Sequence, residues 1–248
     1  MQKRNNPNGR ILYRGPSLLD GKPIVAIVTG LAKRSDNGKT GDMLQTWILP
    51  DNGETPQANA TSGRDDSVCG DCKHRPVNGG TCYVNLGYAP LAIADCLNHG
   101  SGYAMATDIA ALGDGRKVRL GAYGDPAAVP VAIWQALVSR ATNRTGYSHQ
   151  WRNPAFAALS DLCMASVDTI AERAEAKLMG WRTFRVRPST EGVATQPNEI
   201  ACPASKEAGV KSSCDKCGLC KGASIMAKDI AIFVHAASDA KLERAIAA

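Results

Sequence analysis

The sequence lacks a long apolar run. No apolar stretch approaches the roughly 20 residues that a membrane-spanning helix requires, so we expect no membrane partner. The first seven residues carry charge without the apolar segment that follows it in a secretory signal. Composition also excludes collagen, coiled-coil and low-complexity classes. With 44% apolar residues in a chain of 248, there is enough material for a full core. We therefore expect a globular, cytoplasmic protein.

A large excess of one charge is also absent. The chain has 29 basic and 23 acidic residues, a net charge of +6. Residues 173–221 hold nine Lys or Arg against five Asp or Glu. Such a balance permits contact with nucleic acid or an anionic substrate without requiring it, and a solvated surface is the simpler explanation.

Alternating strand and helix patterns predict the α/β class. A polar arm is expected over residues 1–20 and a single domain over 21–248, with loops at 30–41 and 51–68. The expected strands cover 24–29, 44–49, 117–123, 145–151, 162–167, 183–186 and 230–235, and the expected helices cover 89–97, 130–141 and 170–179. The last helix begins with a capping-box pattern, Thr169 to Glu172. The spacing favours a βα barrel or partial barrel with a parallel sheet.

In such a sheet, functional residues collect after the carboxyl ends of the strands. The polar residues at four successive strand ends are Gly124, Asp125, His149, Ser166, Asp168, Arg185 and Arg187. His149 is a candidate general acid or base, or else a structural histidine. Arg185 and Arg187 share a strand face and could bind an anion together, or pair with Asp125 or Asp168.

The Gly38-Lys39-Thr40 triplet does not form a phosphate-binding loop. Position 33 is Lys where that motif requires glycine, and the residues after Gly41 have a strand pattern where the motif requires a helix. A turn is the simpler prediction for this triplet.

Nine cysteines in a chain without an export signal indicate metal binding or catalysis rather than disulfides. The later cluster is Cys202, Cys214, Cys217 and Cys220. Its Cys-x-x-Cys-x-x-Cys run suits an iron–sulfur cluster, for which bacterial ferredoxins add a fourth cysteine followed by proline. Here the corresponding Cys202-Pro203 pair lies upstream of the run instead of downstream. Zinc and plain buried thiols are the alternatives.

The earlier cluster is Cys69, Cys72 and Cys82. The candidates for a fourth ligand are Cys96, His74 and His99. Three thiolates around a cluster would leave one position open for substrate or S-adenosylmethionine, whereas a fourth thiolate from Cys96 would close a structural zinc site. We therefore predict metal-binding segments at 69–96 and 202–220. Cys163 lies in an apolar strand and is predicted to be a core residue.

Several motifs carry a resemblance to known families. They are Cys69-x-x-Cys72 with Cys82-Tyr83, residues 118–126, residues 145–151, residues 164–168, residues 181–186 and the 202–220 cysteines. Together they resemble an uncharacterised, cysteine-rich family carried by phages and plasmids, over about residues 20 to 235. More distantly, a Cys-Tyr-ended cluster ahead of a Gly-Asp-Pro strand end is similar to radical S-adenosylmethionine enzymes, although the spacing here is Cys-x2-Cys-x9-Cys.

The second resemblance implies a radical-enzyme-like barrel and specific site roles. Cys69, Cys72 and Cys82 would hold the reactive 4Fe–4S cluster, and Gly124 and Asp125 would lie near S-adenosylmethionine. The 202–220 cysteines would hold an auxiliary cluster. The expected function is thus an iron–sulfur enzyme acting on an unknown substrate, with nucleic acid or a nucleotide as one candidate. The alternatives are a zinc-stabilised nucleic-acid-binding protein and an electron-transfer protein that works with an electron donor.

Overall fold

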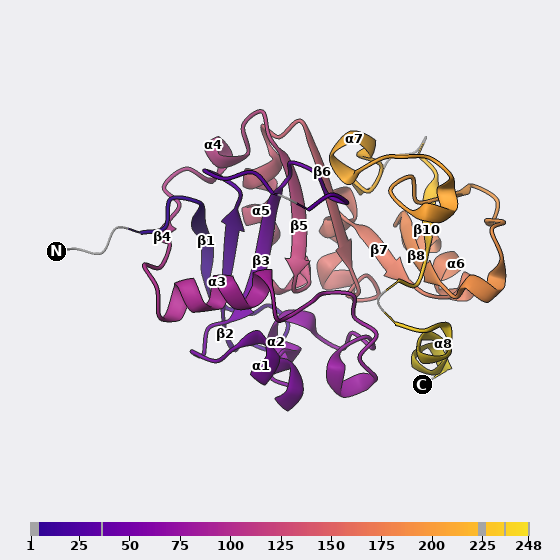
Figure 1. The fold of residues 1–248 in the computed structure, drawn as a ribbon, viewed down its shortest axis with the longest axis horizontal. Coiled ribbons are helices and arrows are strands. Elements are labelled where there is room, and N and C mark those ends of the chain that lie inside the picture. Colours follow the sequence, from indigo (N-terminus) through magenta and orange to yellow (C-terminus); the bar gives the residue numbers. More distant parts are fainter. Residues whose placement is uncertain (1–4, 36, 223–226, 236, 248) are drawn as a thin grey trace.

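The computed structural model describes residues 5–35, 37–222, 227–235 and 237–247. Within them lies a ten-stranded sheet with the order β4-β1-β2-β3-β5-β6-β7-β8-β10-β9. Seven of its nine pairings are parallel, and the two antiparallel ones join β1 to β2 and β2 to β3. The fold is therefore α/β, and its sheet is compatible with a partial barrel (Figure 1).

The strands have these bounds: β1 Gly9–Pro16, β2 Pro23–Thr29, β3 Leu44–Pro50, β4 Ala104–Met105, β5 Lys117–Tyr123, β6 Asn143–Ser148, β7 Met164–Val167, β8 Thr183–Arg187, β9 Glu199–Ala201 and β10 Asp229–Phe233. Five of the seven residues of β2 and all seven of β3 are buried. Continuous burial of this kind is typical of strands covered on both faces.

The helices have these bounds: α1 Pro56–Ser62, α2 Asp66–Cys69, α3 Ala89–Asn98, α4 Ile109–Gly113, α5 Val131–Val138, α6 Ile170–Leu178, α7 Cys214–Cys217 and α8 Asp239–Ala247. In α5, Trp134 and Leu137 are fully buried, and Trp134 Nε1 donates to the Pro126 carbonyl at 2.9 Å. The predicted capping box is confirmed, because Glu172 N donates to Thr169 Oγ1 at 3.0 Å and the Glu172 side chain returns to the Thr169 N–H.

Most expected strands are confirmed within a few residues. Cys163 is fully buried, as predicted for a core thiol. After the loop at 30–41, β3 begins at Leu44, so the chain continues as a strand where a phosphate-binding loop would require a helix.

Two expectations are wrong. Residues 9–16 do not belong to a polar arm but form β1, because Ile11 and Leu12 are buried when this strand pairs with β2 and β4. Residues 51–68 contain α1 and the start of α2 rather than a loop. Thr55 caps α1 through the Ala58 N–H (3.2 Å), and Pro56 occupies the first helical position, where proline is favoured.

The two ends of the parallel strands carry different cysteine segments. In Figure 1, α2 lies at the end of the sheet toward which the arrow of β5 points, and α7 lies at the opposite end. The contacts agree with this picture, since the Asp125 N–H after β5 donates to Val68 of α2, and Gly218 after α7 approaches Asn143 at the start of β6.

Candidate metal centres

Asp125 and His149 lie side by side at the carboxyl ends of β5 and β6. Asp125 is 5% exposed. Its Oδ1 accepts hydrogen bonds from Ser148 Oγ (2.8 Å) and the Ala127 N–H (2.9 Å), and its Oδ2 accepts one from the His149 N–H (2.7 Å). The His149 ring nitrogen Nδ1 lies 3.9 Å from Oδ2. The structure thus brings together the two residues predicted to be catalytic.

Burial governs the protonation of Asp125. Desolvation raises the pKa of its carboxyl group, while the charge of His149 and the three hydrogen bonds oppose that rise. The net shift of the Asp125 pKa is upward, so burial makes this carboxyl group easier to protonate than a free one.

Gly124 is required by the backbone before Asp125. Its φ is +81°, and a Cβ at this position would lie 2.7 Å from Ile48 Cβ. Only glycine combines that conformation with so close an approach of β3. The tight turn sets the position of the Asp125 carboxylate at the end of the sheet.

The three-cysteine site, Cys69, Cys72 and Cys82, lies at the same end of the sheet. The charges of Cys72, Cys82 and Asp125 all act on the Cys69 thiol. Desolvation raises the thiol pKa of Cys69 well above its usual value, that of Cys72 to about 12 and that of Cys82 to about 11. Cys82 is the exposed residue of the three, whereas Cys69 and Cys72 are half-buried.

Backbone donors point at two of these sulfurs. The His74 N–H donates to the Cys72 thiol and the Val84 N–H donates to the Cys82 thiol, and both bonds oppose the rise in thiol pKa. Each donor lies two residues after its cysteine. Hydrogen bonds to sulfur of this type stabilise metal-bound thiolates, so the donor set is chemically suited to a metal centre.

A charged network ties this segment to β7 and α6. Asp168 Oδ2 lies 2.9 Å from His74 Nε2 and 3.0 Å from Lys73 Nζ. Glu172 Oε1 lies 3.0 Å from the same Lys73 nitrogen. Desolvation raises the pKa of Asp168, but the hydrogen bond and charges of His74 and the charge of Lys73 outweigh it, so the net shift is downward.

The roles of Lys73 and Glu172 are visible only in the structure. Glu172 belongs to the predicted capping box, and only tertiary packing shows that it also holds Lys73. His74, a candidate fourth ligand, uses both ring nitrogens within the protein, because Nδ1 lies 2.5 Å from Thr81 Oγ1. His74 therefore anchors the cysteine segment to Asp168.

Cys96 lies away from the three-cysteine site. Its sulfur accepts a hydrogen bond from Asn6 Nδ2 (3.4 Å) and lies 3.9 Å from the Gly102 carbonyl oxygen. Desolvation raises the thiol pKa of Cys96, but hydrogen bonds, first among them that from Asn6, bring it below its ordinary value. The described contacts therefore associate Cys96 with the loop after α3, and not with the predicted zinc site.

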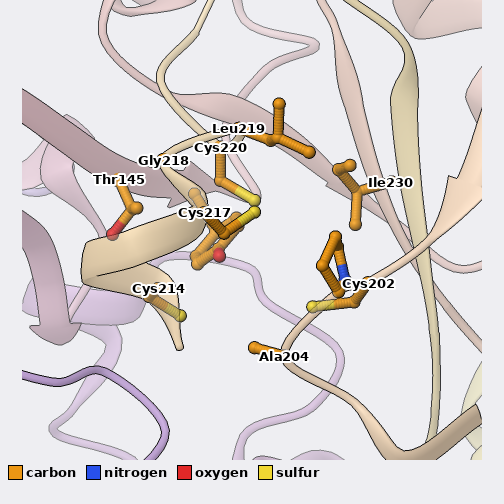
Figure 2. Close-up of a pocket in the computed structure, with 11 residues that line it drawn as sticks. Thr145, Cys202, Ala204, Cys214, Cys217, Gly218, Leu219, Cys220 and Ile230 are labelled. Carbon is orange, nitrogen blue, oxygen red and sulfur yellow. The ribbon is translucent and has the colours of Figure 1, made fainter. Parts of the chain in front are cut away.

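The four-cysteine site consists of Cys202, Cys214, Cys217 and Cys220. Figure 2 shows their side chains directed toward one small cavity, which Ala204, Leu219 and Ile230 also line. The free volume is about 10 Å³, close to the room of one water molecule. The structure therefore brings all four cysteines of the later cluster to one place.

Basic and hydroxyl groups surround the four-cysteine site. Desolvation raises the thiol pKa of Cys214, and the charges of Arg119 and Lys39 oppose the rise. Burial likewise raises the pKa of Cys220 to about 12, opposed by a hydrogen bond with the Tyr147 hydroxyl. In Cys202 the Ala204 N–H donates to the thiol, again two residues after the cysteine. Positive charge and donors at the sulfurs favour thiolates.

Arg119 connects the two cysteine sites. It hydrogen-bonds through Nη2 to the hydroxyl of Tyr83, the residue after Cys82, and its guanidinium lies 5.7 Å from the centroid of the Tyr83 ring. The same guanidinium acts on Cys214 and Tyr147. Its Nε is buried and has no hydrogen-bond partner among the described residues. One side chain from β5 thus reaches the surroundings of both sites.

Arg185 and Arg187 bind within the protein. Arg185 is fully buried and forms two hydrogen bonds to Glu199 (both 3.0 Å) and two to Glu191 (2.7 and 3.0 Å). Arg187 donates to the carbonyls of Gly192 (2.8 Å) and Ala194 (2.9 Å). The expected partners Asp125 and Asp168 are wrong, because the loop after β8 folds back and supplies nearer acceptors. Binding of a cofactor by these arginines stays a prediction.

Among the described residues, no three His, Cys, Asp or Glu side chains are arranged to hold one metal ion. No helix in those ranges is long and apolar enough to cross a membrane. Comparison with protein-family models, curated proteins and solved structures finds no match. The functional argument therefore depends on the geometry of the two cysteine sites.

Proposed function

We propose that this chain is an iron–sulfur protein with two metal centres and that it is an enzyme similar to radical S-adenosylmethionine enzymes. The observation that carries the proposal is the three-cysteine site at the carboxyl end of the parallel strands, next to Asp125 and His149. Ligands of parallel α/β folds bind at that end. The mostly parallel sheet, which is compatible with a partial barrel, supports this assignment.

In the proposed site, Cys69, Cys72 and Cys82 hold a 4Fe–4S cluster with one open coordination position. A bound cluster of this kind would supply one electron to S-adenosylmethionine. Asp125 and Gly124 form the wall beside that ligand, and His149, 30% exposed at its side chain, moves a proton to or from the substrate. Lys73 and His74 keep the cysteine segment on Asp168. We propose nucleic acid or a nucleotide as the substrate class.

The four-cysteine site has a different task in this proposal. All four positions would be filled by thiolates, so a cluster there could not bind substrate and would store or transfer electrons. Its triple Cys-x-x-Cys spacing supports a cluster, since zinc sites are usually built from two separate pairs. A four-iron cluster would require the 211–222 loop to move outward from the small cavity.

A zinc-stabilised nucleic-acid-binding protein is the second candidate. The small volume of the four-cysteine cavity favours it, because a single ion needs far less space than a cluster. In that case the cysteines only hold loops together, and the purified protein is colourless.

Metal analysis after anaerobic purification tests the two candidates. We expect a brown protein with about eight iron and eight sulfide per chain. The Cys72→Ser and Cys217→Ser variants should each lose about half of both, whereas the control Cys163→Ser, which changes a core thiol, should keep the full content. Colourless protein with one or two zinc ions after iron–sulfur reconstitution would overturn the iron–sulfur proposal.

Binding of S-adenosylmethionine tests the enzymatic part separately. We expect the protein loaded with both clusters to bind it, and the Cys72→Ser variant to lose that binding. If the fully loaded protein shows no affinity, the enzyme proposal fails and an electron-transfer protein remains.

A further inference from the structure

Arg119 carries a positive charge that no carboxylate in the described part of the chain balances. The side chain is half-buried, and it forms no ion pair with an Asp or Glu among those residues. The one hydrogen bond that they give it runs from Nη2 to the neutral hydroxyl of Tyr83. A guanidinium has five N–H donors, and a charge taken partly out of water is costly unless an opposite charge accompanies it. Arg119 is therefore suited to receive an anion.

Lys39 is a second cation near the thiol that Arg119 approaches. The charges of both side chains act on the thiol of Cys214. Lys39 likewise forms no ion pair with a carboxylate of the described residues. The acid that its charge does reach is Glu207, whose Oε1 accepts a hydrogen bond from the Phe233 N–H at 2.7 Å. Two positive charges thus meet near α7 without a carboxylate paired to either.

His235 fixes the position of Lys39 beside Tyr83. Lys39 Nζ lies 3.2 Å from His235 Nε2, and His235 Nδ1 lies 3.1 Å from the Phe233 carbonyl oxygen. Because a carbonyl oxygen only accepts and an ammonium group only donates, Nδ1 carries the proton and Nε2 accepts from Lys39. The ring of the same histidine lies against the Tyr83 ring, with the two centroids 5.9 Å apart. Contacts therefore run without a break from Arg119 through Tyr83 and His235 to Lys39.

Four distant parts of the chain supply these residues, which we call the Arg119 cluster. They are Lys39 in the loop before β3, Tyr83 in the first cysteine segment, Arg119 in β5 and His235 after β10. The Cys214 N–H donates to the Lys39 carbonyl at 2.8 Å, which holds the loop before β3 against α7. The Arg119 cluster is therefore a product of the fold, not of one charged run in the sequence.

The Arg119 cluster is open to solvent on one side. Tyr83 is 47% exposed and His235 is exposed, whereas Lys39 and Arg119 are half-buried. A ligand can therefore arrive from solvent and meet two charges that are partly shielded from it. Such shielding strengthens charge-assisted hydrogen bonds relative to those on an open surface.

We infer that the Arg119 cluster binds a phosphate group, and that this group is the phosphate of a nucleotide substrate. The second part rests on the proposed function, whereas phosphate binding itself requires no metal. Arg119, Lys39 and the Tyr83 hydroxyl donate to the phosphate oxygens, and His235 is a positioning residue for Lys39. Because Tyr83 directly follows Cys82, a phosphate bound here lies beside the three-cysteine site.

Charge and the number of donors favour a phosphate over a carboxylate. A phosphate monoester carries roughly −1.5 to −2 charges at pH 7 and has three strong acceptor oxygens. The Arg119 cluster offers two cations and one hydroxyl, whereas a carboxylate has a single charge and would leave one cation unpaired. Arginine binds phosphate through its planar fork and lysine binds it as a point charge. The two side chains therefore match one phosphate group.

The Arg119 cluster differs from a phosphate-binding loop, although Lys39 belongs to the Gly38-Lys39-Thr40 triplet. The N–H groups of Lys39 and Thr40 donate to Asn37 Oδ1 at 3.0 and 3.2 Å. These backbone donors are therefore used within the loop, while a phosphate-binding loop directs its amides at the ligand. In the Arg119 cluster, side chains hold the phosphate.

Binding of four nucleoside 5′-monophosphates to the purified, metal-loaded protein tests the inference by titration calorimetry. We expect at least one of them to bind with a Kd of about 1 mM or less, and its nucleoside without phosphate to bind at least about tenfold more weakly. Arg119→Gln and Lys39→Gln should each weaken nucleotide binding at least about tenfold. The control Arg116→Gln removes a charge already engaged by Asp42 and the Gly30 carbonyl, and should stay within about twofold.

A further variant and a competitor complete the test. Tyr83→Phe removes one donor without changing charge and should weaken binding about threefold or more, so it decides the matter if Arg119→Gln fails to fold or loses metal. Inorganic phosphate should compete with the nucleotide but bind at least about tenfold more weakly. Equal affinity for inorganic phosphate would overturn the nucleotide assignment in favour of the free ion.

The metal content of the same samples separates this inference from the proposed function. Colourless zinc protein whose nucleotide binding depends on Arg119 would support the phosphate site while the iron–sulfur proposal fails. The inference alone is overturned if protein with both clusters binds none of the four nucleotides, or if the Arg119 and Lys39 variants bind as tightly as the wild type or the control binds as weakly as they do. Variants that lose metal but keep nucleotide binding overturn it too, because the two cations would then serve only the Cys214 thiolate.

Discussion

At the scale of single residues, burial, opposed by nearby charge and hydrogen bonds, controls how readily each thiol can become a thiolate. Desolvation raises the pKa values of Cys72, Cys82 and Cys220 far above that of a free thiol. A metal ion reverses that effect, because it binds the thiolate directly. Basic side chains near the sulfur therefore contribute to how firmly a metal is held.

Arg119 is the residue whose replacement tests this idea. Its charge opposes the rise in the Cys214 thiol pKa, so Arg119→Met should make the thiolates easier to protonate and the metal easier to remove. We expect a chelator to remove metal from the four-cysteine site on the order of 3–10 times faster than in the wild type. Loss of metal can be followed by absorbance with a chromogenic chelator.

Arg116→Met provides the control, because Arg116 lies just before the same strand but bonds to the Gly30 carbonyl and Asp42. Equal rates of metal loss in the two variants would show that Arg119 has no special influence on the cysteines.

At the scale of elements, α6 links ordinary helix capping to the candidate site. Thr169 caps the helix, and Glu172 completes the capping box. The same Glu172 carboxylate binds Lys73, which lies between Cys72 and His74. Glu172, which the capping-box pattern of the sequence predicts, therefore also holds the cysteine segment that contains Lys73.

Thr169→Ala should lower the free energy of unfolding by about 1 kcal/mol, the usual cost of losing an N-cap. Because Glu172 loses its capping partner, we also expect faster metal loss from the three-cysteine site. Urea denaturation measures the first effect and chelator kinetics the second. Thr169→Ser retains the hydroxyl, so it should keep the stability and the slower metal loss of the wild type. A serine variant as unstable as the alanine variant would argue against the capping explanation.

At the scale of the whole molecule, a buried ion pair links two strands at one edge of the sheet. Arg185 of β8 and Glu199 of β9 are both fully buried at their side chains, and they form two parallel hydrogen bonds. Desolvation raises the pKa of Glu199, but the hydrogen bonds and charge of Arg185 outweigh it and the net shift is downward. The pair fastens the segment after β8, which leads to Cys202.

Glu199→Gln should therefore cost about 3 kcal/mol of stability at pH 7, since it leaves a buried guanidinium short of one counterion. A carboxyl group with a lowered folded-state pKa contributes its stability above the unfolded value, about 4.3 for glutamate, and loses it as the pH falls through the folded value. The difference between variant and wild type should accordingly shrink below about pH 4. Urea denaturation at pH 7 and pH 3.5 measures it.

Glu191→Gln changes the more exposed partner of Arg185, whose side chain is 32% exposed, and should cost less. A Glu199→Gln penalty that stays constant down to pH 3.5 would contradict the role of the carboxylate charge.

The sequence by itself determined the α/β class, most of the strands and the two cysteine clusters. Apolar β-branched runs predict buried strands because they fit a pleated, covered sheet, and short Cys-x-x-Cys spacings bring thiols together in any compact loop. Both patterns depend only on residues close together in the sequence, so they can be recognised without knowledge of the fold. β1 was missed because its two buried hydrophobic residues, Ile11 and Leu12, lie among polar neighbours.

Only the tertiary structure decided which distant groups meet. The pairing of Arg185 with Glu199, the anchoring of His74 on Asp168, the position of Cys96 and the gathering of basic residues around α7 depend on strand order and loop paths. Charged side chains accept many partners at similar cost, so their sequence positions do not select one. The sheet makes that selection, because its parallel strands have their amino ends together at one end of the sheet and their carboxyl ends together at the other.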